Sequence, residues 1–162
     1  MARWAEGPHP AASSAPPASD VGAGGHTLGM DITLLQPAGL VVSPAFSHVA
    51  VVPPGATTIY VGGQNGVDET GAVVSADAGE QALRALENAE TALTAAGAGL
   101  DDVISWTALI HQSADLRAAY GAVAAKLARD GAPPLVTAAI VAGLGVPGAL
   151  IEVSAVAALV RT

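Results

Sequence analysis

The stretch TIYVGGQNGVDETGAVV, residues 58–74, contains the pattern on which the fold prediction rests. Its first residues are β-branched or aromatic and predict a strand at 58–62, with Gly-Gly-Gln as a tight exit. The DETG sequence at 68–71 then predicts a loop between strands. Glycine at the end of a buried strand lets a ligand or another backbone approach closely. Gly62 and Gly63 therefore either line a ligand site or merely permit a bulge.

The composition around this stretch predicts one domain with a core of small side chains. The chain has 162 residues, of which 51% are hydrophobic, 12% are charged and only 3% are aromatic. Alanine, valine, leucine and glycine bury less apolar area per residue than larger side chains do. Such a chain gains stability when it buries further surface against copies of itself. We therefore expect an oligomer.

Charge and residue types exclude several functional classes. The net charge is −8 and the six basic residues are scattered, which argues against nucleic acid as a partner. The absence of cysteine excludes disulfides, thiolate nucleophiles and cysteine metal sites. The four histidines show no metal-ligand spacing, so we expect neither a metal ion nor another cofactor.

Two apolar features could suggest a membrane protein, and neither fits. The N-terminus lacks the basic region and apolar run of a signal peptide. The segment 135–160 is strongly apolar, but Gly143, Gly145, Pro147 and Gly148 interrupt it well before the roughly 20 residues that a spanning helix needs. Two strands around a turn fit this segment better. We expect a cytoplasmic protein without a membrane partner.

The chain divides into a tail and one folded domain. Residues 1–29 are rich in Pro, Ala, Ser and Gly without apolar periodicity, which predicts disorder, and residues 30–162 form the predicted domain. Within the domain, periodicity and turn residues predict six strands, at 32–35, 47–52, 58–62, 103–111, 135–141 and 149–157, and two helices, after Asp77 and at about 114–129. The order βββαβαββ predicts an α+β fold with a mixed sheet.

The two helices carry recognisable caps and apolar faces. Asp77 is a predicted N-cap with Glu80 three residues later, and Ser113 is the predicted cap of the second helix. The predicted buried stripes are Ala82, Leu86, Ala89 and Leu93 in the first helix, and Leu116, Ala119, Val123 and Leu127 in the second. Strand alternation in 103–111 places Trp106, Ala108 and Ile110 on one face.

Four strings in this domain resemble a known family. They are PAFSHVAVV at 44–52, YVGGQNGVDETGAVV at 60–74, EQALRALENAETALTAAGAGLDDVISWTALI at 80–110 and PGALIEVSAVA at 147–157. They are similar to the RidA/YjgF/YER057c/UK114 family, or Rid superfamily, of imine and enamine deaminases. The resemblance implies a chorismate-mutase-like (YjgF-like) subunit, in which a mixed six-stranded sheet carries two helices on one face. It also implies a homotrimer with three clefts between subunits, lined by Gly62, Gly63 and Gln64.

Departures from the family suggest a changed pocket. The family's arginine, which grips a substrate carboxylate, falls on Val136, and no arginine occurs between 130 and 160. The family's tyrosine becomes Phe46, its serine becomes Gly62, its small polar residue becomes Ala138 and an asparagine becomes Tyr120. A pocket without a cation binds an anion poorly. We therefore expect a small neutral, hydrophobic imine or enamine as ligand, with Trp106 bordering the pocket.

Glu152 is the predicted catalytic residue. It matches the family's glutamate that positions the attacking water, and an isolated carboxylate in an apolar strand is a candidate general acid or base. His111, at a strand end, is a second candidate. Alternatively, Glu152 is structural, held by backbone amides, Lys126 or Arg161, and His111 is an ordinary surface residue.

Three functions are therefore compatible with the sequence. The first is a hydrolase that deaminates a neutral imine or enamine in the inter-subunit cleft, with Glu152 handling water and proton transfer. The second is a non-catalytic trimer of the same fold that binds a small molecule or a protein. The third is a scavenging protein that exposes apolar surface in the manner of a chaperone.

Overall fold

A computed structural model of the chain describes residues 30–160. Residues 1–29, for which we predicted disorder, lie outside the described residues. Within the described part, six strands and two helices follow each other in the predicted order βββαβαββ. The strands are β1 (Thr33–Leu35), β2 (Val49–Val51), β3 (Thr57–Asn65), β4 (Val103–His111), β5 (Leu135–Val141) and β6 (Ile151–Leu159), and the helices are α1 (Ala78–Ala95) and α2 (Leu116–Leu127).

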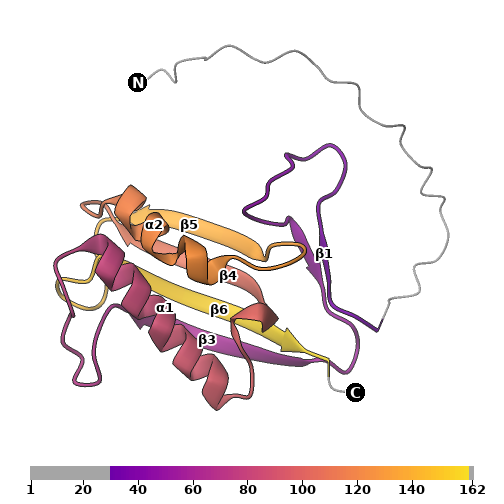
Figure 1. Cartoon of the computed structure of the whole chain (residues 1–162), viewed down its shortest axis with the longest axis horizontal. Coiled ribbons are helices and arrows are strands. Elements are labelled where there is room, and N and C mark those ends of the chain that lie inside the picture. The colour runs from indigo at the N-terminus through magenta and orange to yellow at the C-terminus, as the bar shows by residue number, and fades with distance from the viewer. Residues whose placement is uncertain (1–29, 161–162) are drawn as a thin grey trace, which may run out of the picture.

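The larger sheet has four strands in the order β3-β6-β4-β5. The β3–β6 and β6–β4 pairs are antiparallel and the β4–β5 pair is parallel, so the predicted mixed sheet is confirmed. Both helices lie on one face of this sheet, as Figure 1 shows. The predicted α+β fold is therefore confirmed.

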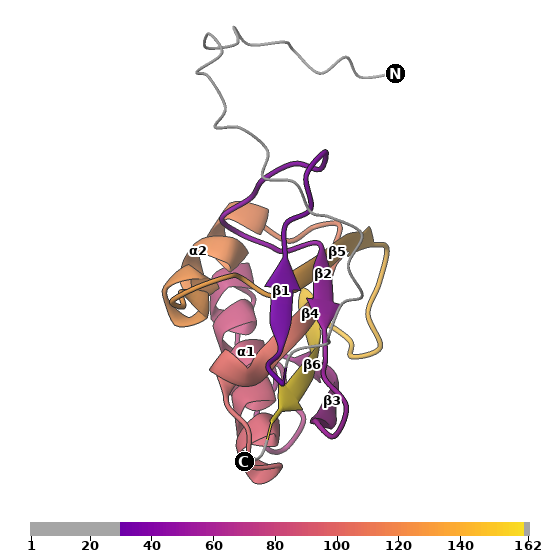
Figure 2. The ribbon, with the colours of Figure 1, turned by 90° about the vertical axis from the view of Figure 1, so that its right-hand side faces the viewer.

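The prediction of a single six-stranded sheet is wrong, because β1 and β2 pair only with each other among the described strands. Pro53 and Pro54 follow one residue after β2, and proline has no backbone N–H to donate to a neighbouring strand. The Ser47 N–H instead donates to the Pro134 carbonyl, 3.1 Å away, next to the start of β5. The β1–β2 pair consequently sits beside one end of the larger sheet (Figures 1 and 2).

Strand β3 continues beyond the predicted end at Gly62. It includes Gly62, Gly63 and Gln64 and ends at Asn65. Its pairing with β6 shifts between Val61 and Gln64, which is a β-bulge, and then resumes. The Gly-Gly-Gln sequence therefore forms a bulge inside the strand and is not an exit from it.

The DETG sequence forms the predicted loop after β3. The Asp68 carboxylate accepts hydrogen bonds from the Thr70 hydroxyl and from the N–H groups of Thr70 and Ala72, at 2.7–3.0 Å. The hydrogen bond from the Thr70 side chain, followed by those from the two backbone groups, lowers the pKa of Asp68 below its ordinary value. The loop is thus ordered by its own side chain.

Helix α1 matches the sequence prediction. The Asp77 carboxylate accepts from the Glu80 N–H at 2.9 Å, so Asp77 is the N-cap. All four residues of the predicted stripe are buried, and Leu93 is 0% exposed. Leu86, Ala89 and Leu93 pack in a core with Val61 and Val103, and Ala82 packs in a second cluster with Ala119 and Ile151.

Helix α2 differs from the prediction at its start and along its length. The cap is Asp115, whose carboxylate accepts from the Arg117 and Ala118 N–H groups, and it is not Ser113. The Ser113 hydroxyl is instead hydrogen-bonded to His111 Nδ1 at 2.7 Å, which leaves it no role at the helix. Of the predicted stripe, only Ala119 is buried, while Leu116 is 46% exposed and Val123 and Leu127 are partly buried. Helix α2 therefore does not close against the sheet.

The described part of the chain contains neither a helix suited to a membrane nor a cluster of metal-binding side chains. Among residues 30–160 no helix combines the length and apolar character needed to cross a bilayer. Within the same residues no three His, Asp or Glu side chains gather as a metal site would require.

Candidate functional site

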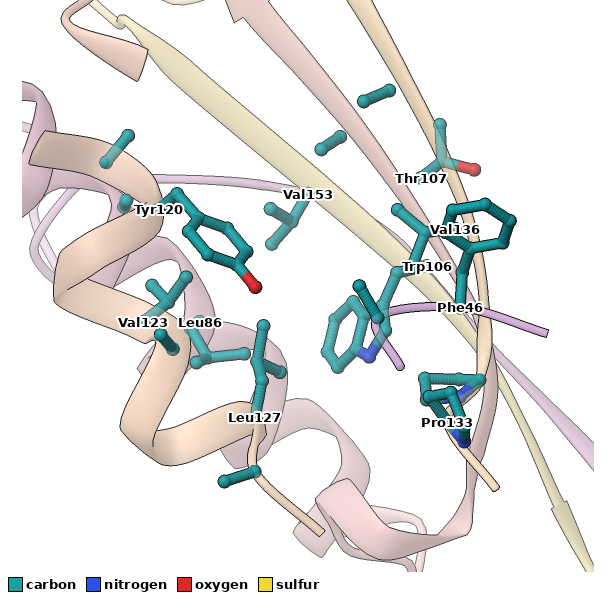
Figure 3. Close-up of a pocket in the computed structure, with 18 of the residues that line it drawn as sticks. Phe46, Leu86, Trp106, Thr107, Tyr120, Val123, Leu127, Pro133, Val136 and Val153 are labelled. Atoms are coloured by element: carbon teal, nitrogen blue, oxygen red, sulfur yellow. The ribbon is translucent and has the colours of Figure 1, made fainter. Parts of the chain in front are cut away.

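A cavity of about 570 Å³ lies between α2 and the helix-bearing face of the larger sheet. Figure 3 shows side chains of α2 on one side of it and side chains of the strands on the other. Residues from the α2–β5 connection and from the segment before β2 complete its wall. The cavity exists because most of the apolar stripe of α2 does not reach the sheet.

Five residues predicted for the pocket line this one cavity: Phe46, Trp106, Tyr120, Val136 and Ala138. Strand register explains why three of them meet. Trp106 pairs with Val136, and Ala108 pairs with Ala138, across the parallel β4–β5 ladder. Residues directly opposite each other point to the same side of a sheet. The five residues stay predicted site residues, and the structure brings them together.

Phe46 reaches the cavity from outside the larger sheet. The neighbouring Ser47 N–H is bonded to the Pro134 carbonyl at 3.1 Å, which anchors this segment near β5. The rings of Phe46 and His48 pack edge to face, with centroids 5.4 Å apart and an interplanar angle of 82°. His48 Nε2 is 2.8 Å from the Val41 carbonyl oxygen. His48 thus supports the placement of the Phe46 ring.

Among the described residues, the cavity wall contains one cation, Arg129, and backbone carbonyls occupy its Nη atoms. Tyr120 and Arg129 are the titratable residues of its wall within residues 30–160. The Arg129 Nη atoms donate to the Val103 and Asp101 carbonyls at 2.9 and 2.8 Å, and its Nε is sealed from solvent. A ligand carboxylate would therefore find no unengaged guanidinium there.

Glu152 does not belong to the cavity wall. Ile151 and Val153 line the cavity while Glu152, between them on β6, does not. Successive side chains of a strand point to opposite faces, so the carboxylate lies on the face away from the helices. It is half-buried there, opposite Leu109 of β4 and Asn65 of β3.

The contacts of Glu152 also explain one of the two glycines in the opening stretch. A Cβ atom on Gly63 would lie 2.5 Å from Glu152 Oε1 and 2.8 Å from its Cδ, so the end of the Glu152 side chain occupies its present position because residue 63 is glycine. A Cβ on Gly62 would meet open space. Asn65 Nδ2 donates to the Ile151 carbonyl at 3.0 Å and lies 3.4 Å from Glu152 Oε2.

Lys126, which the sequence suggested as a structural partner of Glu152, pairs with a different carboxylate. The Lys126 ammonium lies 2.7 Å from Glu90 Oε2, where it links α2 to α1. Arg161 lies outside the described residues. The amide of Asn65 is the polar group that the structure places beside the Glu152 carboxylate.

The predicted site residues therefore fall into two groups. Gly62, Gly63, Gln64 and Glu152 lie along the β3–β6 pair and contribute nothing to the cavity wall. His111, whose Nδ1 is bonded to Ser113, is also absent from the wall. One copy of the chain does not bring Glu152 and the cavity together.

Sequence reasoning missed several wall residues. Leu86, Val123, Leu127 and Pro133 line the cavity although we had assigned the first three to the core. Their apolar periodicity was visible, but periodicity gives the side that faces the sheet and not the distance to it. The cluster of Pro133 and Pro134 after α2 was likewise visible only as a helix stop.

Comparisons with known proteins agree with the fold. The family model described as endoribonuclease L-PSP matches residues 40–159. Among solved structures, YyfB from Yersinia pestis, a protein of unknown function in the Rid family, is 25% identical with a TM-score of 0.68, and the match covers 79% of this chain and 98% of that chain.

Two Escherichia coli structures are also similar. The YjgF gene product is 27% identical with a TM-score of 0.56, over 65% of this chain and 83% of that one. TdcF with bound serine is 25% identical with a TM-score of 0.57, over 74% of this chain and 94% of that one. No curated protein matches the chain significantly. The chain belongs to the endoribonuclease L-PSP family, the family of the YjgF and RidA proteins that its sequence resembles.

Proposed function

We propose that the protein hydrolyses a neutral, hydrophobic imine or enamine. The observation that carries this proposal is the apolar cavity in which Val136, 45% exposed, stands at the position of the family's carboxylate-binding arginine. Moving a carboxylate into such a cavity without a cationic partner is costly. Family membership supports a small-molecule reaction, and the cavity selects against the 2-iminoacids that carry a carboxylate.

We propose that the active site forms between subunits of a homotrimer. Glu152 and the cavity lie on opposite faces of the sheet, so Glu152 can approach a bound ligand only from a neighbouring copy. Strand β5, at the sheet edge, leaves Val136 and Ile140 45% and 64% exposed. An exposed apolar edge strand is stabilised when another chain covers it. This arrangement supports the cleft between subunits that the family resemblance implies.

The chemistry needs one group that both accepts and donates a proton. In the proposed reaction the Glu152 carboxylate accepts a proton from water while the water oxygen bonds to the imine carbon. The resulting carboxylic acid protonates the nitrogen and gives a neutral carbinolamine. Glu152 then accepts the hydroxyl proton of the carbinolamine and transfers it to the nitrogen, so that the C–N bond breaks as the carbonyl forms and the neutral amine leaves. An enamine first gains a proton at carbon and then follows the same course. This is general acid–base catalysis by a single carboxyl group.

A second candidate is a non-catalytic trimer that binds a small molecule or a protein. The close fit of Glu152 against Gly63 and its contact with Asn65 favour this alternative, because they account for a carboxylate with a purely structural role. Ribonuclease activity, which the family description mentions, has less support. The net charge is −8 and the cavity wall offers no free cation for a phosphate.

The test is hydrolysis of imines generated in solution by an amine oxidase or an amino-acid oxidase, followed by competition with semicarbazide. One panel of imines is neutral and the other carries a carboxylate. We expect wild type to accelerate hydrolysis of the neutral panel, and Glu152→Gln to lower that rate by roughly 10²–10⁴-fold, the usual contribution of a general acid–base. Glu69→Gln, which changes an exposed loop carboxylate, is the matched control.

Two further measurements separate the candidates. Val136→Arg should shift activity toward the carboxylate-bearing panel, because it restores a cation beside the cavity. Analytical ultracentrifugation measures the mass of the assembly and so tests whether the protein is a trimer. A wild type without effect on either panel would defeat the hydrolase proposal and favour the binding protein. Ligand binding that survives Glu152→Gln unchanged would point the same way.

A further inference from the structure

The cavity gathers the aromatic residues of a chain that has very few of them. The sequence contains five aromatic residues, and three of these, Phe46, Trp106 and Tyr120, line this one cavity. They come from three separate parts of the chain: the segment before β2, strand β4 and helix α2. The core elsewhere is built mainly from alanine, valine and leucine. Three of the five rings therefore border the cavity, and one of them, Trp106, also belongs to the main core cluster.

The indole nitrogen of Trp106 has no partner in the protein. Trp106 is only 7% exposed, yet its Nε1–H makes no hydrogen bond to any residue in the range 30–160. The side-chain polar atoms of these residues that are both sealed and unpaired are Ser47 Oγ and Arg129 Nε. Trp106 Nε1 is not among them, so part of its surface is accessible, and the Trp106 side chain lines the cavity. A buried indole N–H usually has an acceptor.

The Tyr120 hydroxyl supplies a second polar group from across the cavity. Figure 3 shows this hydroxyl pointing from α2 into the space that the Trp106 ring enters from β4. Tyr120 is 65% exposed, and its hydroxyl makes no hydrogen bond within the described residues. The two groups lie on facing walls, one provided by the helix and the other by the sheet.

These groups define the chemistry of a complementary ligand. The wall contains no Asp or Glu, and its single guanidinium is already engaged by two backbone carbonyls. An unpaired indole N–H donates only, so it matches an acceptor such as a carbonyl oxygen or an imine nitrogen. Three aromatic rings match an aromatic body. A volume of about 570 Å³ lies within the range of small-molecule sites.

We infer that the cavity binds a neutral aromatic carbonyl compound, or the aryl imine derived from it, and that Trp106 Nε1–H orients the ligand by donating to its oxygen or nitrogen. The Tyr120 hydroxyl donates to the same acceptor from the opposite wall. The inference rests on the proposed function for the reaction that follows binding. Binding itself needs only this cavity, and Trp106 is the residue that sets specificity.

Calorimetric titration of the full chain with three probes of similar shape tests the inference. Acetophenone has an aromatic ring and a neutral acceptor, ethylbenzene has the ring without an acceptor, and benzoate has the ring with a negative charge. We expect acetophenone to bind about tenfold more tightly than ethylbenzene, which is the value of one well-placed hydrogen bond. Benzoate should bind more weakly than either, since no free cation lines the cavity.

Variants assign the difference to the two polar groups. Trp106→Phe keeps an aromatic ring and removes the N–H donor. It should therefore lower the affinity for acetophenone about tenfold and change the affinity for ethylbenzene by less than about twofold. Tyr120→Phe should weaken acetophenone by roughly threefold by the same reasoning. Tyr60→Phe is the matched control, because the Tyr60 hydroxyl lies outside the cavity wall. If Trp106→Phe does not fold, Tyr120→Phe still tests the inference, because the exposed Tyr120 side chain can be changed without disturbing the core.

Several outcomes would overturn the inference. Equal affinity for acetophenone and ethylbenzene would show that the cavity does not recognise the carbonyl oxygen. If Trp106→Phe lowered the affinity for both probes equally, the indole would contribute only by packing of its ring. Two other outcomes distinguish a failure of this inference from a failure of the proposed hydrolase function. Acetophenone binding without imine hydrolysis would defeat the hydrolase and keep the inference. Hydrolysis of aliphatic imines without acetophenone binding would keep the hydrolase and defeat the inference.

Discussion

Helices α1 and α2 cover the same face of the same sheet, yet they pack against it very differently. Eight residues of α1 are buried, whereas α2 buries only Ala119 among its twelve residues. The volume that α2 leaves unfilled is the aromatic cavity. One helix therefore completes the core and the other provides the wall of a binding site, although both are rich in alanine.

The contacts of each helix explain the difference. Helix α1 is tied down at its start and in its middle. Gln81, 0% exposed and in the first turn, donates to the Ser75 and Gly148 carbonyls and accepts from the Leu150 N–H. Asn88, in the middle of the helix, donates to the Asn65 and Val67 carbonyls. Helix α2 is held near its two ends, by the Asp115 cap and by the guanidinium of Arg129 just beyond its last turn. A helix anchored at its ends can stand away from the sheet in its middle.

The largest expected difference in stability is between two leucine-to-alanine variants, one in each helix. Leu93→Ala should lower the free energy of unfolding by about 2–5 kcal/mol, because Leu93 is completely buried in the core. Leu127→Ala should cost about 1 kcal/mol or less, since this side chain already borders empty space. Urea unfolding of both variants measures the two losses. Similar losses would mean that α2 closes on the sheet in solution.

A smaller effect is expected at the paired glycines of β3. Gly63→Ala should destabilise the protein by about 1 kcal/mol, because its methyl group would displace the Glu152 carboxylate from its contact with Asn65. Gly62→Ala should stay within about 0.5 kcal/mol, because open space surrounds that position. Thermal unfolding of the two variants makes the comparison. A harmless Gly63→Ala would show that Glu152 is free to leave this position.

The smallest expected effect concerns the start of α2. Asp115→Ala should lower the free energy of unfolding by about 1 kcal/mol, the usual cost of losing an N-cap. Ser113→Ala should cost less, because the Ser113 hydroxyl bonds only to the exposed His111 ring. The test is chemical denaturation of both variants side by side. A larger loss in Ser113→Ala would contradict the assignment of Asp115 as the cap.

Much of the fold followed from local patterns. Helix α1 was predicted with its cap and its buried face because Asp77 and the spacing of Ala82, Leu86 and Leu93 act within a few turns of one helix. Strands β4 and β5 were predicted with their observed bounds for the same reason. The family resemblance, carried by longer strings, was confirmed by the family model and by similar structures.

The errors concern pairings between distant segments. The sequence does not show that β3 runs through Gly62 and Gly63, because the bulge exists only in the register with β6. The position of the β1–β2 pair is likewise not visible in the sequence, because the bond that anchors it joins Ser47 to Pro134, which are far apart in the chain. For the candidate site, five of the residues named from the sequence line the cavity, while others such as Leu127 and Pro133 were missed and Glu152 lies on the other face.

By itself, the sequence determined the class of fold and the periodic faces of its helices and strands. These properties are local, since they depend on residue type and on spacings of a few residues. Only the tertiary structure decided that Trp106, Tyr120 and Phe46 surround one cavity while Glu152 contacts Gly63. Register, bulges and the distance between a helix and a sheet arise from packing between distant segments, which no local spacing encodes.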